Sequence, residues 1–60
     1  MKPVRVFHKP TMSLGFVTIQ DKDNEGHLLA RPIYEFKSDD SATIIYSYNW
    51  EAFQYVETDT

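Results

Sequence analysis

Apolar and polar positions alternate along most of the chain, and this alternation predicts short β-strands. Every second residue of a strand points to the same face, and β-branched and aromatic residues favour sheets. In residues 14–20, for example, Leu14, Phe16 and Thr18 share one side, with apolar residues on the other, which is typical of a central strand. The pattern predicts five strands, at residues 3–10, 14–20, 27–37, 42–48 and 53–57.

Turn-forming residues separate these segments. The clearest cluster is residues 21–26, which ends in Gly26, a residue that readily takes a positive φ. A second turn is predicted at residues 38–41. Pro32 lies in the middle of the third strand, and because proline cannot donate to a strand ladder, it indicates a bulge, a bend or an edge position there.

The segment 44–56 holds the only tryptophan and more than half of the aromatic residues. We expect Asn49 to cap one helical or 3-10 turn at residues 49–52, with Trp50 and Phe53 on a shared side. Before it, one strand face must be core, and we expect the face with the tyrosines. If Ile45 points inward instead, Tyr46 and Tyr48 are exposed and available to a partner. Alternation puts Ile44, Tyr46 and Tyr48 on that face, and Thr43, Ile45 and Ser47 on the other.

The predicted elements favour a mainly β fold in a single domain over residues 1–60, a small antiparallel five-stranded barrel or bent sheet. Their order of hairpin, bent strand, hairpin, single turn and short last strand resembles the SH3-like small barrels in arrangement. The acidic, aromatic-rich first loop and the paired tryptophan of SH3 peptide-binding domains are missing, so no functional residue is carried over. The alternative fold is a four-stranded antiparallel sheet with a C-terminal helix over residues 50–58.

Composition narrows the functional classes. The chain has no cysteine, which excludes disulfides and cysteine-ligated zinc. No apolar run approaches the roughly 18–20 residues of a membrane span, so we expect a cytoplasmic protein without a membrane partner. The net charge is −3, with three bases and no acid in residues 1–20, and five acids and no base in residues 38–60.

Candidate chemistry is sparse. Residues 21–26 resemble the first half of a calcium loop, but the twelfth position, where a bidentate glutamate is needed, is Pro32. His8 and His27 have no evident local partner, and Asp39-Asp40-Ser41 is typical of a turn. A sixty-residue domain has little room for a pocket of the usual roughly 300 Å³ or more. We therefore expect no enzyme, no metal and no cofactor.

The leading hypothesis is a small non-enzymatic protein-binding domain that docks on a larger partner through an aromatic and acidic face. Such a chain fits an accessory or inhibitory protein, as small viral (phage) proteins often are. Tyrosine and tryptophan dominate binding hot spots, and acids can surround them. The partner-binding residues predicted on this basis are Tyr46, Tyr48, Trp50, Phe53, Asp39, Asp40 and Glu51.

Two alternatives remain open. One is a nucleic-acid-binding small β-barrel that uses basic residues interleaved with aromatic ones, although a net charge of −3 disfavours contact with phosphates. The other is a homo-oligomer formed through exposed strand edges, which would compensate for a small core. The residues predicted for nucleic-acid binding are Arg5, Phe7, His8, Lys9 and Arg31.

Overall fold

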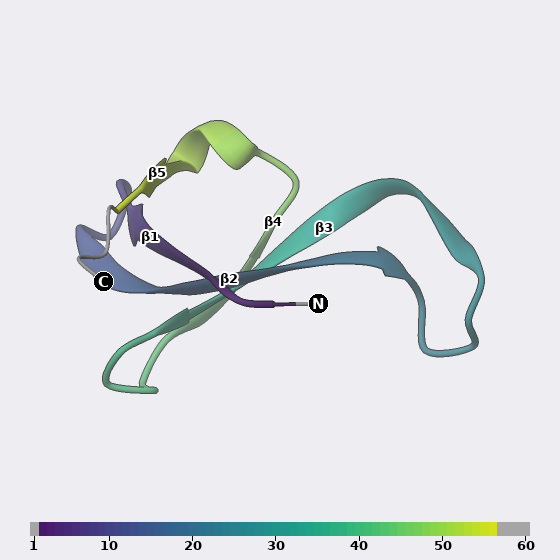
Figure 1. Ribbon diagram of the computed structural model, residues 1–60, viewed down its shortest axis with the longest axis horizontal. Helices are drawn as coiled ribbons and strands as arrows, with labels where there is room; N and C mark the ends of the chain where they lie inside the picture. The colour runs from purple at the N-terminus through teal and green to yellow at the C-terminus, as the bar shows by residue number, and fades with distance from the viewer. Residues whose placement is uncertain (1, 57–60) are drawn as a thin grey trace.

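Five antiparallel strands in one sheet make up most of residues 2–56, the part of the chain that the computed structural model describes. The sheet order is β4-β3-β2-β1-β5, so β2 is central, as the sequence predicts (Figure 1). The elements are β1 (Val4–His8), β2 (Ser13–Lys22), β3 (Leu28–Ser38), β4 (Ile44–Ser47), the 3-10 turn η1 (Trp50–Ala52) and β5 (Phe53–Tyr55).

The mainly β prediction is confirmed, but the sheet is not closed into a barrel. Strands β4 and β5 lie at opposite edges of the sheet and are not paired with each other. The alternative of a C-terminal helix is wrong for residues 50–56, because 50–52 form the short η1, 53–55 form β5 and Val56 lies in neither. The last two positions of that expected helix, 57 and 58, lie outside the described residues.

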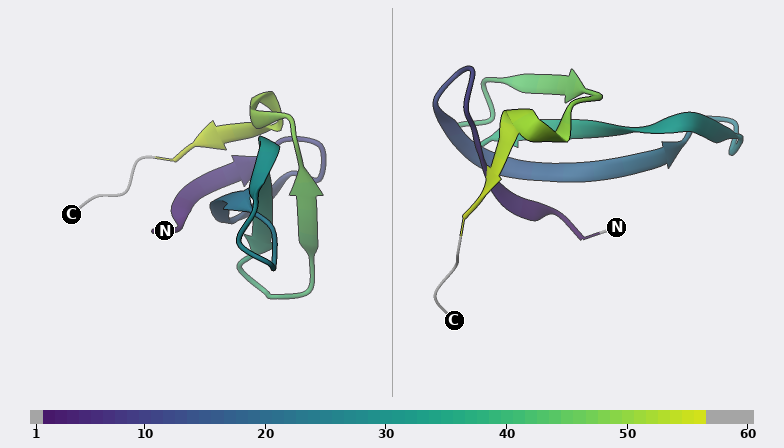
Figure 2. Two further views of the ribbon diagram at one scale, coloured as in Figure 1. Left: turned by 90° about the vertical axis from the view of Figure 1, so that its right-hand side faces the viewer. Right: turned by 90° about the horizontal axis from the view of Figure 1, so that it is seen from above.

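A strong bend brings the two ends of the sheet together. In the sheet order β3 and β5 are three strand spacings apart, about 14 Å in a flat sheet. The ring centroids of Phe36 on β3 and Phe53 on β5 are nevertheless only 5.8 Å apart. Figure 2 shows that β1 and β5 run at a steep angle to β3 and β4. The sheet is therefore folded over on one face, and side chains of β3 and β5 meet inside the fold. The face inside this bend is the inner face of the sheet, and the opposite face is the outer face.

The core lies on the inner face and is small. Strand pairing places Val17 opposite Phe36, and Val6 opposite Gly15, so these positions share that face. Val6, Val17 and Phe36 are fully buried, and Phe53 closes the cluster from β5. Burying one such side chain contributes about 1.5–3 kcal/mol, so each of them matters in a domain whose core rarely supplies more than roughly 3–5 kcal/mol net.

Gly15 allows β2 and β3 to approach each other over the core. A Cβ at this position would collide with the backbone carbonyl of Lys37 and would lie 2.8 Å from both the Phe36 ring and the Cα of Ser38. Two of these three atoms are backbone, which has little freedom to move aside. The position therefore requires glycine for its lack of volume rather than for its conformational freedom.

The third strand is irregular around Pro32, as the sequence predicts. Gln20 pairs with Ile33 and Lys22 with Leu28, so the single residue between them on β2 faces four residues on β3. Beyond this irregularity the hairpin continues as an arm of residues 21–32, almost entirely exposed, which projects to one side in Figure 1. Its turn is the predicted one, with Gly26 at φ 86° and the Asp23 carboxylate accepting from the backbone N–H groups of Glu25 and His27.

The expected orientation of the fourth strand is wrong. Ile45 pairs with Phe36 and packs against the core. The opposite set therefore faces solvent on the outer side, with exposed fractions of 52% for Ile44, 59% for Tyr46 and 53% for Tyr48. The alternating pattern separated the two sets correctly, but the register with Phe36 decides which set is inside.

Substitution of Gly15 by alanine tests the close approach of β2 and β3. Since the added methyl meets backbone atoms, we expect a loss of about 3 kcal/mol in the free energy of unfolding, the upper end for overpacking. Urea unfolding followed by circular dichroism measures it.

The matched control is Gly26→Ala, at a turn where the added Cβ meets nothing within 4 Å and the positive φ is the only obstacle. We expect this variant to lose only about 1 kcal/mol. Equal losses at the two glycines would contradict the steric argument at Gly15.

Candidate protein-binding site

Four aromatic rings meet where η1 joins β5. Trp50 lies at ring-centroid distances of 5.0 Å from Tyr34, 5.7 Å from Phe53 and 5.4 Å from Tyr55. Phe53 is 5% exposed and forms the floor of the group, Tyr34 and Trp50 are partly exposed, and Tyr55 is 67% exposed. These four residues, called the aromatic corner below, come from β3, η1 and β5.

Local hydrogen bonds fix the backbone that carries Trp50. The side chain of Asn49 caps η1 by accepting from the backbone N–H of Glu51 at 3.0 Å, which confirms the predicted cap. Asn49 in turn donates its own backbone N–H to the hydroxyl of Ser47 at 3.0 Å. At the other end, the N–H of Phe53 donates to the carbonyl of Trp50. The indole is therefore presented from a turn that is held at both ends.

The structure divides the aromatic residues predicted to bind a partner. Trp50 and Phe53 belong to the aromatic corner, whereas Tyr46 lies on the outer face at the β4 edge. Tyr48 is exposed but has Arg31 stacked on its ring, with the guanidinium carbon 4.7 Å from the ring centroid. Phe53 is 5% exposed and supports Trp50 from below, so its predicted contact with a partner stays a prediction.

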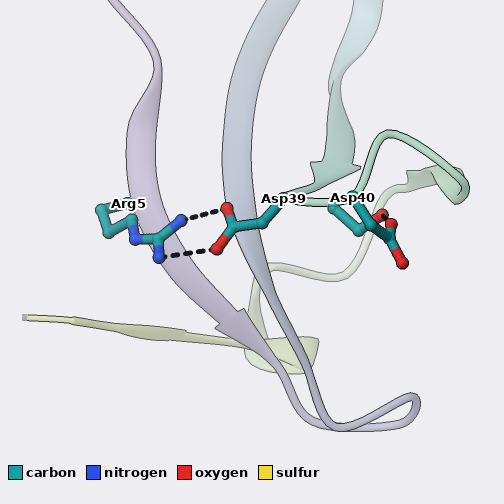
Figure 3. A network of polar contacts seen from close by, with 4 residues as sticks. Arg5, Asp39 and Asp40 are labelled. Atoms are coloured by element: carbon teal, nitrogen blue, oxygen red, sulfur yellow. Dashed lines mark hydrogen bonds and ion pairs between the residues drawn. The ribbon is translucent and has the colours of Figure 1, made fainter.

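The predicted acidic rim is also divided. Asp39 and Asp40 occupy the turn before β4, at the end of that strand opposite to η1. Asp39 forms a two-point ion pair with Arg5 of β1, with one contact at 2.8 Å (Figure 3). The hydrogen bond and charge of Arg5 lower the pKa of Asp39. Glu51, exposed in η1, is the predicted acid that lies beside the aromatic corner.

Asp40 stabilises the turn that contains it. Its carboxylate accepts from the Ser38 hydroxyl at 2.5 Å and from the backbone N–H of Ala42 at 2.9 Å, and these bonds lower the pKa of Asp40. The Ser38 oxygen also accepts from the backbone N–H of Thr43 at 3.1 Å. This carboxylate has a structural role in the turn, as the sequence indicated.

The residues predicted to bind nucleic acid do not gather on one surface. Arg5 is paired with Asp39 and stacks 4.9 Å from the Phe16 ring centroid on the outer face. His8 is 4% exposed and lies on the inner face between Phe36 and Phe53, at 5.1 and 5.2 Å. Of the others, Phe7 is half-buried on the outer face, Lys9 is exposed in the turn after β1, and Arg31 lies on Tyr48.

An open hollow of about 620 Å³ lies on the outer face, which corrects the expectation that the chain is too small for a pocket. Phe16 and Thr18 supply one side of it, and cross-strand pairing sets Lys37 and Glu35 beside them. Alternation in residues 14–20 grouped Phe16 and Thr18 on one side of β2. It did not show that this side faces outward or that β3 would add these charges. The lining holds no histidine or cysteine. The hollow is lined by Lys2, Pro3, Phe16, Thr18, Glu35 and Lys37.

Comparisons of this chain with protein families, with curated proteins and with solved structures found no match. Within residues 2–56, no group of three or more histidine, cysteine, aspartate or glutamate side chains is placed to hold a metal ion. Among these same residues, no helix is long and apolar enough to cross a membrane. The candidate site therefore rests on geometry.

The burial of His8 makes stability depend on pH. Burial disfavours the charged imidazole and lowers the pKa of His8 from its ordinary value of about 6.5. Below that value the unfolded chain binds a proton that the folded chain does not. We therefore expect the His8 contribution to the free energy of unfolding to be constant above about pH 7 and to fall as the pH decreases towards about pH 5.

Urea titrations across this range measure the effect. The His8→Phe variant keeps an aromatic ring between Phe36 and Phe53 and should lose this part of the pH dependence, with both proteins carrying His27→Gln so that no second histidine contributes. An unchanged slope in His8→Phe would contradict the assignment. The lowered pKa values of Asp39 and Asp40 place their titration below this window.

Proposed function

We propose that the protein is a small non-enzymatic binding domain that docks on a larger protein through the aromatic corner. The observation that carries the proposal is the cluster around Trp50, whose ring packs between Tyr55, which is 67% exposed, and the buried Phe53. Solvent-exposed rings on a fixed support are a typical arrangement of a binding hot spot.

Two properties of the aromatic corner favour binding: the area that its rings can bury and the small entropy lost when they are immobilised. An aromatic ring buries about 150–250 Å² and has few torsions to immobilise. The caps at both ends of η1 have already ordered the backbone of Trp50, which lowers the entropy lost on binding. Glu51 adds one exposed acid beside these rings and favours a partner with a basic group at that position.

The proposal extends to the class of protein. A small chain with an exposed aromatic surface of this kind fits an accessory or inhibitory protein, of the kind that phages encode, acting in the cytoplasm. We also propose an SH3-like arrangement for the fold. The strand order β4-β3-β2-β1-β5 and the position of η1 between β4 and β5 support it.

Nucleic-acid binding has less support. It requires basic groups that can reach phosphates along one path. Arg5 is already paired with Asp39, and the imidazole of His8 is buried on the other face of the sheet. A titration with single- and double-stranded oligonucleotides at low salt tests this alternative, and it should give no salt-dependent binding.

Affinity capture with matched tyrosine variants tests the proposed site. Tyr55→Ala removes the most exposed ring of the aromatic corner, and Tyr46→Ala removes a ring of similar exposure from the β4 edge. We expect protein captured by the wild type to be lost with Tyr55→Ala and retained with Tyr46→Ala. For a captured partner, calorimetry should show a loss of about 2 kcal/mol or more for Tyr55→Ala.

Both variants are first compared with the wild type by circular dichroism, so that a loss of binding is not a loss of fold. If Tyr46→Ala loses the partner and Tyr55→Ala retains it, the binding surface is the outer face and the proposed site is wrong. If the wild type captures no protein, the proposed function itself fails.

A further inference from the structure

Strand β4 has an open edge. Within residues 2–56 it pairs with β3 on one side and with no strand on the other. The carbonyl of Thr43 accepts from the N–H of Ser38, so the backbone of Thr43 faces β3. In an antiparallel ladder this direction alternates. The backbone groups of Ile45 therefore also face β3, and those of Ile44 and Tyr46 face outward.

The exposed edge lacks the features that usually prevent strand association. Natural edges are commonly protected by lysine, proline or a bulge. Residues 41–50 contain no charged residue and no proline, and β4 pairs with β3 without interruption from Ile44 to Ser47. Although the whole chain carries a net charge of −3, two β4 strands could meet without a like-charge contact inside this segment.

We propose that β4 pairs with β4 of a second copy of this chain, antiparallel and about a two-fold axis at Ile45. Ile44 then lies opposite Tyr46 of the second copy, and Tyr46 opposite its Ile44. Both residues direct their backbone groups outward, so each of these two pairs forms two hydrogen bonds. The two five-stranded sheets become one continuous sheet of twice the width.

The side chains agree with this register. The inner and outer faces continue across the axis, so a residue must meet one from the same face. On the outer side an isoleucine meets a tyrosine twice, and an aromatic ring beside a β-branched side chain is a favourable cross-strand pair. On the inner side the two copies of Ile45 meet, and Thr43 meets Ser47 of the second copy. A shift of one residue would set Ile45 against Tyr46, which point to opposite faces.

The contact is small, and this sets the expected strength. β4 has four residues, so the buried area falls in the class of weak and transient interfaces. The residues of the aromatic corner belong to β3, η1 and β5, and none of them is on β4. The self-association therefore does not depend on the proposed binding function, and either one can fail without the other.

Sedimentation velocity from micromolar to millimolar concentration tests the proposal. The wild type should shift from monomer to dimer as concentration increases. Ile44→Lys with Tyr46→Lys sets like charges opposite each other across the axis, and it should raise the dissociation constant about tenfold or more. Ile44→Glu with Tyr46→Lys sets opposite charges there and should preserve the dimer. The new glutamate would also lie beside Lys37, and the new lysine beside Glu35, within each chain.

The control for the other edge is Gln54→Lys on β5, which should leave the dimer intact. Circular dichroism confirms that each variant is folded. A wild type that remains monomeric over the whole range overturns the proposal. A dimer lost in Gln54→Lys but kept in Ile44→Lys with Tyr46→Lys shows the β5 edge to be the contact and also overturns it.

An introduced cysteine reports the register, because the chain has none of its own. The two copies of residue 45 form a non-hydrogen-bonded pair about 4.5 Å apart between Cα atoms, within the range of a disulfide. Under mild oxidation Ile45→Cys should form a covalent dimer, whereas Ser47→Cys, on the same face but displaced along the strand, should not. Faster cross-linking of Ser47→Cys would exclude this register.

Discussion

The missing side chain at Gly15 is the constraint on which the inner face depends. Without a Cβ at this position, β2 can lie close to the backbone of Lys37 and Ser38, with the Phe36 ring beneath it. That ring then meets Phe53 of β5, which holds the bend of the sheet. The bend in turn brings β5 close enough to β3 for Tyr34 to reach Trp50. The aromatic corner proposed to bind a partner thus depends on the absence of a single methyl group at position 15.

Much of the fold could be predicted because its signals are local. The hairpin turn at 21–26, the irregularity at Pro32 and the cap at Asn49 each depend on residues close together in the sequence. The facing of β4 could not be predicted, since both of its faces carry apolar residues. It is decided by the pairing of Ile45 with Phe36, a contact between distant segments that alternation alone does not specify.

The candidate site was predicted less completely for the same reason. The prediction of a turn correctly separated Trp50 from the preceding strand. It did not show that the Trp50 ring packs against Tyr34, which lies sixteen positions earlier in the sequence. Asp39 was interpreted as part of an acidic face, whereas its charge is matched by Arg5, 34 residues away in the sequence. Composition gives the number of charges and rings on a surface, and only strand register determines which of them are neighbours.

The hairpin arm has a consequence for how the molecule opens. All the fully buried side chains lie on the other side of the irregularity at Pro32, so residues 21–32 contribute almost nothing to the core. Segments with few buried apolar contacts exchange their amide protons through local fluctuations rather than through global unfolding. We therefore expect the arm to open without the core, and an insertion at the tip of the arm to change the free energy of unfolding of the core by well under about 1 kcal/mol.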